Sequence, residues 1–216
     1  VTTDEHEANL TEVEVKLIAA GFLKLLQEKT GKDLQSLKIA IGHDSRITGE
    51  KIKKHLTEVF TNAGVEVLDA GLATTPALFM ATQFNEINAD AGIMITASHL
   101  PFFYNGLKFF TKDGGAEHED MEKIVDYSDF ETEIAGREIG TIKEIELIEL
   151  YAQDLVNKIK EQTDLEKPLK DMHIVLDAGN GAGGFFAEKV LEKLGADTTG
   201  SQFLEPDGTF PNHIPN

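Results

Sequence analysis

The stretch AGIMITASH, residues 91–99, sets the fold class, because an uninterrupted apolar run leads directly into a polar turn. A continuous apolar run of this length is typical of a strand that is buried on both faces of a sheet. In parallel α/β sheets, ligands gather at the turns that follow the carboxyl ends of the strands. The stretch therefore predicts a buried strand over 91–95 and a candidate binding turn at 96–99.

Strands and helices alternate on both sides of this stretch. Apolar residues at helical spacing predict a helix between Asn9 and Glu28, with Gly31 as its stop signal. The same reasoning predicts strands over 37–41, 65–68 and 106–111 and helices over 49–62, 76–84, 116–127 and 144–160. Such alternation predicts an α/β fold, with layered sheets sandwiched between helices.

A charged stretch with weak periodicity, residues 129–140, separates two parts of the chain. We place a domain boundary there, with a first domain over 1–140 and a second over 141–216. After Pro168 the α/β pattern restarts, with a strand over 173–177, a glycine-rich turn, a helix over 184–194 and a strand near 198–204. Because the chain stops before this second sheet would be complete, we expect the second domain to be incomplete.

Composition excludes several classes of partner and site. The 216 residues carry a net charge of −18, which argues against nucleic acid or an anionic membrane as the main partner. The apolar runs are too short to span a bilayer, and the acidic start predicts no signal peptide. The chain has no cysteine, which excludes disulfides and thiolate metal sites and fits a cytoplasmic protein.

Ser98, His99 and Lys108 form a candidate catalytic set around the turn that follows residues 91–95. A serine nucleophile needs a proton acceptor and cationic help, and this loop contains candidates for both. Taken singly, each of the three is more simply an ordinary turn or strand residue. Only their spacing carries meaning, and the spacing alone does not specify the reaction.

The loop TASHLPFFYNGLK, residues 96–108, resembles the active-site serine loop of the α-D-phosphohexomutases, in particular the phosphoglucomutase/phosphomannomutase group. Further stretches resemble motifs of that family in the expected order: GHDSR at 42–46, GLATTPAL at 71–78, and LDAGNGAGG at 176–184 with EPDGTFPNH at 205–213. The likeness runs from about Leu10 to the last residue.

The resemblance implies reversible transfer of a phosphoryl group between the 1- and 6-hydroxyls of glucose or mannose phosphate. It implies that phospho-Ser98 is the donor and an oxygen ligand to Mg²⁺, that Lys108 is the general acid/base, and that His99 supports the phosphoserine. Glucose 1,6-bisphosphate is the implied activator. Arg46 either lines the same cleft as a catalytic residue or is a structural arginine paired with Asp44, and the sequence favours neither.

The chain also departs from the family pattern. Leu100 stands where the commonest family loop has asparagine. An opening arginine-bearing segment, the magnesium-binding DGDGDR loop, the sugar-recognition loop and the C-terminal phosphate-binding domain find no match in the sequence. We therefore expect a fragment whose partners are a hexose phosphate and the remaining domains of a full-length enzyme. Alone, the fragment is expected to lack mutase turnover.

Two rival interpretations remain. The turn GNGAGG, residues 179–184, satisfies the dinucleotide-binding pattern after a strand and before a helix, with Glu205 or Asp197 as the later acidic residue. Tight turns favour glycine for backbone reasons alone, so an NAD-binding dehydrogenase is the weaker hypothesis. The other rival is a non-catalytic sugar-phosphate-binding module.

Overall fold

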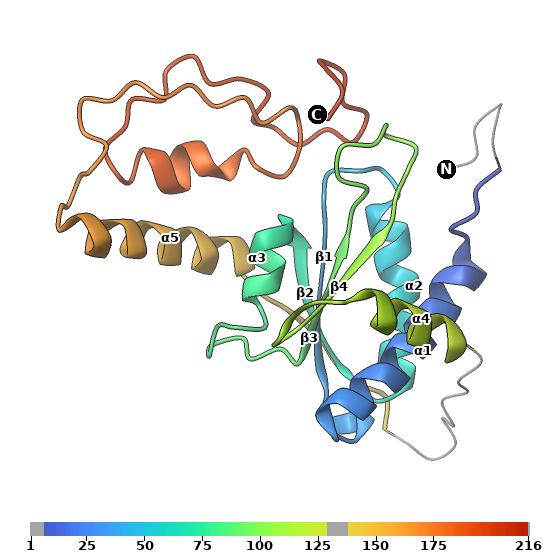
Figure 1. Ribbon diagram of the computed structural model, residues 1–216. Helices are drawn as coiled ribbons and strands as arrows, with labels where there is room; N and C mark the ends of the chain where they lie inside the picture. Colours follow the sequence, from blue (N-terminus) through green and yellow to red (C-terminus); the bar gives the residue numbers. More distant parts are fainter. Residues whose placement is uncertain (1–6, 129–137, 216) are drawn as a thin grey trace.

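The computed structural model describes residues 7–128 and 138–215 (Figure 1). A six-stranded sheet with the order β5-β4-β3-β1-β2-β6 forms the centre of the first part. Its strands are β1 (Lys38–His43), β2 (Glu66–Leu72), β3 (Ala91–Ile95), β4 (Leu107–Thr111), β5 (Gly114–Gly115) and β6 (Ile142–Glu144). The helices are α1 (Glu12–Thr30), α2 (Gly49–Asn62), α3 (Thr75–Met80), α4 (His118–Asp126) and α5 (Leu147–Thr163), with short turns η1 (Leu34–Ser36) and the π-helical η2 (Ala187–Leu191).

Strand β3 lies in the interior of the sheet, and all its residues are buried. It pairs parallel with β1, where Ile41 lies opposite Ile93, and antiparallel with β4, where Ile95 lies opposite Leu107. Strands β1, β2, β3 and β6 are mutually parallel, and β4 and β5 form an antiparallel edge. The predicted α/β class is confirmed.

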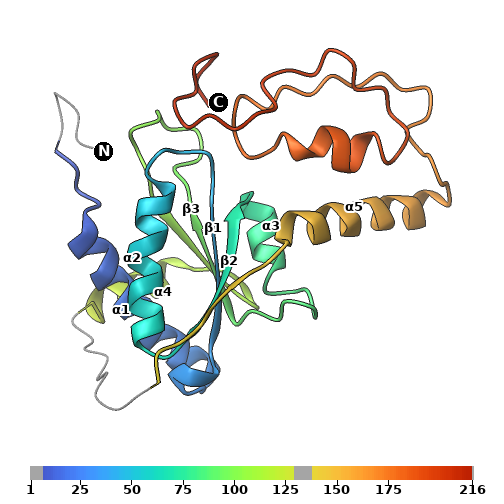
Figure 2. The same cartoon turned by 180° about the vertical axis from the view of Figure 1, so that it is seen from behind.

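Helices cover both faces of the sheet, as Figures 1 and 2 show. Helices α1, α2 and α4 pack on one face over a core that includes Phe22, Phe60, Ile93 and Phe109. Helices α3 and α5 pack on the other face, over a smaller core centred on Met94. The sheet is therefore sandwiched between two helical layers, and its strand ends are left open for loops.

Helix α1 ends at the stop signal that the sequence predicts, and it also has a cap at its start that was not predicted. Thr11 caps its start and exchanges hydrogen bonds with Glu14, and Gly31 ends it in the left-handed conformation at φ 66°. Among the described residues, no helix is long and apolar enough to cross a membrane.

Strand β6 was not among the predicted elements. It pairs parallel with β2, with Leu68 opposite Lys143, and its three residues are exposed. Most of the predicted boundary segment, residues 129–137, lies outside the described residues. The division at residue 140 stays a prediction, and β6 carries the first sheet on to Glu144.

The second part is less regular than predicted. The strands expected over 173–177 and near 198–204 reduce to two isolated parallel bridges, His173 with Asp197 and Asp177 with Gln202. The continuous strands were a wrong prediction, because within the described residues these two segments have only each other to pair with, and two strands alone are marginal in water. The helix expected over 184–194 is shortened to η2, which packs on α5.

Candidate active site

Ser98 lies in the exposed turn that follows the carboxyl end of β3. Its backbone has φ 55°, the left-handed region that residues other than glycine rarely adopt. A strained residue of this kind, about 1–3 kcal/mol above its relaxed state, persists only where the surroundings impose the conformation. The contacts of residues 96–106, which we call the serine loop, supply that constraint.

The turn after β1 supports the serine loop through Asp44. The Asp44 carboxylate accepts a hydrogen bond from the Thr96 hydroxyl at 2.6 Å. That hydroxyl in turn accepts from the Ser98 backbone amide at 3.0 Å. A second link runs from the Asp44 amide to the carbonyl of Ile95 at 3.1 Å. Asp44 and Thr96 therefore fix the serine, and the sequence reasoning did not assign them this role.

Arg46 binds the backbone of the serine loop through its buried side chain. Its side chain is fully buried, and its Nε donates to Asp44 at 3.1 Å. The two terminal nitrogens donate to four backbone carbonyls of the loop, those of residues 98, 100, 101 and 104, at 2.7–3.1 Å. The pairing with Asp44 is the structural alternative that the sequence left open. Arg46 is thus a positioning residue for the loop that carries Ser98.

His99 lies within reach of the Ser98 hydroxyl, whereas Lys108 makes no contact with it. His99 Nδ1 lies 3.3 Å from Ser98 Oγ, and both side chains are exposed. Lys108 lies on β4 opposite Met94, two residues beyond the loop, and is exposed. Among the described residues, its ammonium group makes no hydrogen bond or ion pair. The structure therefore brings Ser98, His99 and the support of Arg46 together, and leaves Lys108 nearby without a contact.

The glycine-rich turn at 179–184 binds its own chain. Asn180 donates from its backbone to the carbonyl of Phe203 and from its side chain to that of Glu205, both at 2.9 Å. A Cβ at Gly184 would lie 2.0 Å from the carbonyl oxygen of Leu204. Glycine is therefore required at position 184 by the close approach of the segment that follows, which is a local reason for the last glycine of the turn that matches the dinucleotide pattern.

Residues 208 and 210 of the same segment contact Arg46, which supports the serine loop. Gly208 forms a parallel bridge with Arg46, and the ring of Phe210 lies 5.3 Å from the guanidinium carbon. A Cβ at position 208 would come within 2.2 Å of the Ser45 carbonyl oxygen. The two motifs GHDSR and EPDGTFPNH, far apart in sequence, therefore meet at Arg46.

Residues 3–134 match the family model described as phosphoglucomutase/phosphomannomutase, alpha/beta/alpha domain I. Residues 149–216 match the model of domain II of the same family. The chain belongs to the phosphoglucomutase/phosphomannomutase family. The predicted resemblance is thereby confirmed.

Relatives and solved structures agree with this assignment. A phosphoglucomutase of Neisseria meningitidis is 36% identical over 179 residues, which cover 83% of this chain and 37% of the relative. A phosphoglucosamine mutase of Alkaliphilus oremlandii is 36% identical over 166 residues, which cover 74% of this chain and 35% of that protein. The chain thus spans little more than a third of these relatives.

A crystal structure of a phosphoglucomutase/phosphomannomutase family protein from Burkholderia thailandensis superposes with a TM-score of 0.78. The match covers 95% of this chain and 43% of that one, at 23% identity. At this identity the match shows the shared fold.

Proposed function

We propose that this chain forms the phosphoserine-bearing part of a phosphohexomutase, which moves a phosphoryl group between the 1- and 6-hydroxyls of a hexose phosphate. The observation that carries the proposal is the exposed, left-handed Ser98 at the end of β3, held by Thr96, Asp44 and Arg46. Phosphoryl transfer depends mainly on positioning of the groups that react, and this serine is positioned by its backbone rather than by its own side chain.

The first chemical step loads the serine. Ser98 Oγ forms a bond to the phosphorus of a sugar bisphosphate, and the bond between that phosphorus and the sugar oxygen breaks. The serine proton passes to a nearby base, and the departing sugar oxygen takes up a proton. His99 Nδ1, 3.3 Å from Ser98 Oγ, is placed to accept the serine proton.

Lys108 is proposed as the general acid/base for the sugar hydroxyl. Its exposed ammonium group has no partner among the described residues, so it is available to a ligand above the loop. In the donor step, phospho-Ser98 passes its phosphoryl group to the free hydroxyl of a hexose monophosphate, which forms the bisphosphate: the bond between Ser98 Oγ and phosphorus breaks, the sugar hydroxyl gives up its proton to a base, and Ser98 Oγ takes up a proton. The family names of the relatives support a sugar phosphate as substrate, and they leave open whether the sugar is glucose, mannose or glucosamine.

The proposed Mg²⁺ would receive one oxygen ligand from this chain, at phospho-Ser98. Mg²⁺ requires about six oxygen ligands, and one exposed serine supplies only one of them. Within residues 7–128 and 138–215, the one group of three carboxylate and imidazole side chains at ligand distance lies elsewhere. When bound, the metal would neutralise charge on the transferring phosphoryl group.

Intact-mass spectrometry of this chain joined to the remaining domains of the enzyme, after incubation with glucose 1,6-bisphosphate, tests the proposal. We expect a mass increase of about 80 Da, the addition of one phosphoryl group, which is removed by glucose 1-phosphate. Ser98→Ala should abolish the increase, and Ser36→Ala, which changes another exposed serine, should leave it intact. An unmodified chain, or a modification that survives in Ser98→Ala, would refute the assignment of Ser98 and favour a non-catalytic binding module.

A further inference from the structure

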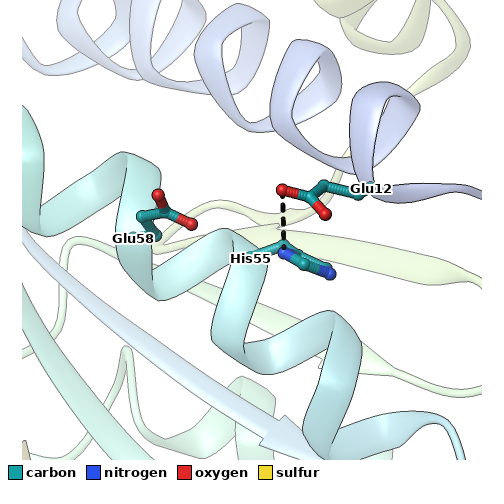
Figure 3. A group of neighbouring side chains, drawn as sticks. All are labelled: Glu12, His55 and Glu58. Atoms are coloured by element: carbon teal, nitrogen blue, oxygen red, sulfur yellow. Dashed lines mark ion pairs between the residues drawn. The ribbon is translucent and has the colours of Figure 1, made fainter.

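A second cluster of ligand-type side chains lies on the helical layer formed by α1 and α2. Glu12 stands in the first turn of α1, and His55 and Glu58 lie one turn apart on α2 (Figure 3). Their ligand atoms all lie within 4.8 Å of one another. None of the three belongs to the serine loop or to its support. The cluster is therefore separate from the proposed mutase chemistry.

His55 is the unusual member of the cluster. Only 8% of its surface is exposed, and neither ring nitrogen has a hydrogen-bond partner. Buried polar groups nearly always have a partner, so an imidazole with two unpaired nitrogens calls for an explanation. Its Nδ1 faces Glu12 Oε1 at 3.8 Å, as the dashed line in Figure 3 shows. This spacing is too long for a hydrogen bond but suits two ligands of one ion.

The two carboxylates already attract a cation. Lys16 Nζ lies 2.8 Å from Glu12 Oε1 and 3.0 Å from Glu58 Oε2. Its ammonium group thus sits between the same oxygens that would bind an ion, and it satisfies the carboxylates but not the imidazole. A metal ion that displaced this ammonium group would bind all three side chains at once and would give His55 Nδ1 a partner.

We propose that Glu12, His55 and Glu58 bind a divalent transition-metal ion such as Zn²⁺, which takes the place of the Lys16 ammonium group. One imidazole with two carboxylates is a donor set that suits zinc better than magnesium or calcium, because those ions select oxygen ligands only. Three protein ligands leave a fourth position for water or another ligand.

The geometry is close to what zinc requires. Bonds of about 2.0–2.2 Å in a tetrahedron place ligand atoms roughly 3.4 Å apart, against 3.8 Å between His55 Nδ1 and Glu12 Oε1. The carboxylates can supply the remaining adjustment, since the side chains of Glu12 and Glu58 are about half exposed. His55 is fixed by burial on α2 and needs no rearrangement to present Nδ1.

The ion would have a structural consequence close to the serine loop. Glu12 and His55 also line a cavity of about 570 Å³, and Tyr104 and Asn105 of that loop line the same cavity. A metal that joins α1 to α2 would fix one wall of this cavity. Binding to the folded state alone also stabilises the fold, by an amount that rises with the logarithm of the ion concentration once that concentration exceeds Kd.

Titration calorimetry of the chain with Zn²⁺ alone, in a buffer without chelating components, tests the proposal. We expect one ion per chain at this cluster and a weakening of affinity by at least about tenfold in His55→Ala, as is usual when a metal site loses a contributing group. Lys16→Met should strengthen binding severalfold, because the competing ammonium group is gone. Co²⁺ in place of zinc should show visible absorption bands that disappear in His55→Ala.

Controls separate this site from casual surface binding. His118→Ala removes another histidine beside a glutamate, an exposed pair at 3.5 Å, and should leave the affinity unchanged. If His55→Ala fails to fold, Glu12→Gln changes an exposed ligand in its place and should weaken binding equally. Absence of Zn²⁺ binding by the parent chain, affinity lost in His118→Ala but not in the cluster variants, or weaker binding in Lys16→Met would overturn the proposal.

Discussion

Replacing Arg46 by methionine tests whether this buried arginine holds the serine loop in place. The change keeps much of the apolar stem and removes the guanidinium, so four carbonyl groups of the loop lose their donor. Asp44 loses its buried cation and keeps two partners, the Thr96 hydroxyl and the backbone amide of residue 46. The variant therefore isolates the contribution of the side-chain charge and its hydrogen bonds.

The expected loss of stability follows from these contacts. A hydrogen bond to a charged group contributes about 1.5–3 kcal/mol, so the four carbonyl bonds set an upper limit of about 6–12 kcal/mol. Water can reach the exposed serine loop in the variant and replace part of this. Removal of one partner from a buried ion pair typically costs about 3–5 kcal/mol, and we expect Arg46→Met to lie in that range.

Urea unfolding and amide hydrogen exchange measure the effect. Lys53→Met is the matched control, because Lys53 is also largely buried and bonds to two carboxylates, those of Glu50 and Asp69, but not to the loop. We expect a loss of about 1 kcal/mol in the control. Exchange in residues 96–106 should speed up only in Arg46→Met. If the two variants were equally stable and amide exchange in residues 96–106 were unchanged, the idea that Arg46 holds the serine loop in place would be refuted.

Two further predictions concern stability. Burial raises the pKa of Asp120, but the hydrogen bond and charge of Lys29 outweigh it and hold the pKa below its usual value. Asp120→Asn should therefore cost about 1–2 kcal/mol at pH 7 and progressively less as pH falls through the lowered pKa of the folded protein, because a lowered pKa gives stability that is lost as pH falls. Urea midpoints measured across pH check this. Gly21→Ala should lower the free energy of unfolding by about 2 kcal/mol, because its Cβ would lie 2.0 Å from the Ile124 carbonyl oxygen. Gly31→Ala should lower it by only about 1 kcal/mol, because position 31 lies in open space and only its left-handed backbone, at φ 66°, disfavours alanine. A smaller loss at Gly21 than at Gly31 would contradict the tight contact between α1 and α4.

Local pattern was sufficient for most of the first sheet and its helices. The apolar run at 91–95 and the helix at 49–62 recur with the same bounds in β3 and α2, because burial and helix-end signals are encoded by adjacent residues. Strand β6 could not be predicted in this way. Its three residues are exposed and carry no apolar alternation, and they form a strand because the edge of β2 is open to them.

The sequence offers candidate site residues but does not give their contacts. The serine, histidine and lysine could be picked out by spacing and resemblance, yet their arrangement depends on Arg46, which bonds to residues 52–58 positions away. Side chains that act across such separations leave no local pattern. His55 gave no signal for the same reason, since only the packing of α1 across α2 brings Glu12 to it.

Arg46 also connects the serine loop to the second part of the chain, and this contact bears on how the loop is positioned. On one side its guanidinium holds four loop carbonyls, and on the other its backbone pairs with Gly208 and its charge lies over Phe210. Because a side chain at position 208 would overlap the Ser45 carbonyl, the second part can approach this closely only with glycine there. Residues 205–213 and the loop that carries Ser98 therefore share one support, the side chain and backbone of Arg46, so we expect a shift of the second part of the chain to be transmitted to Ser98.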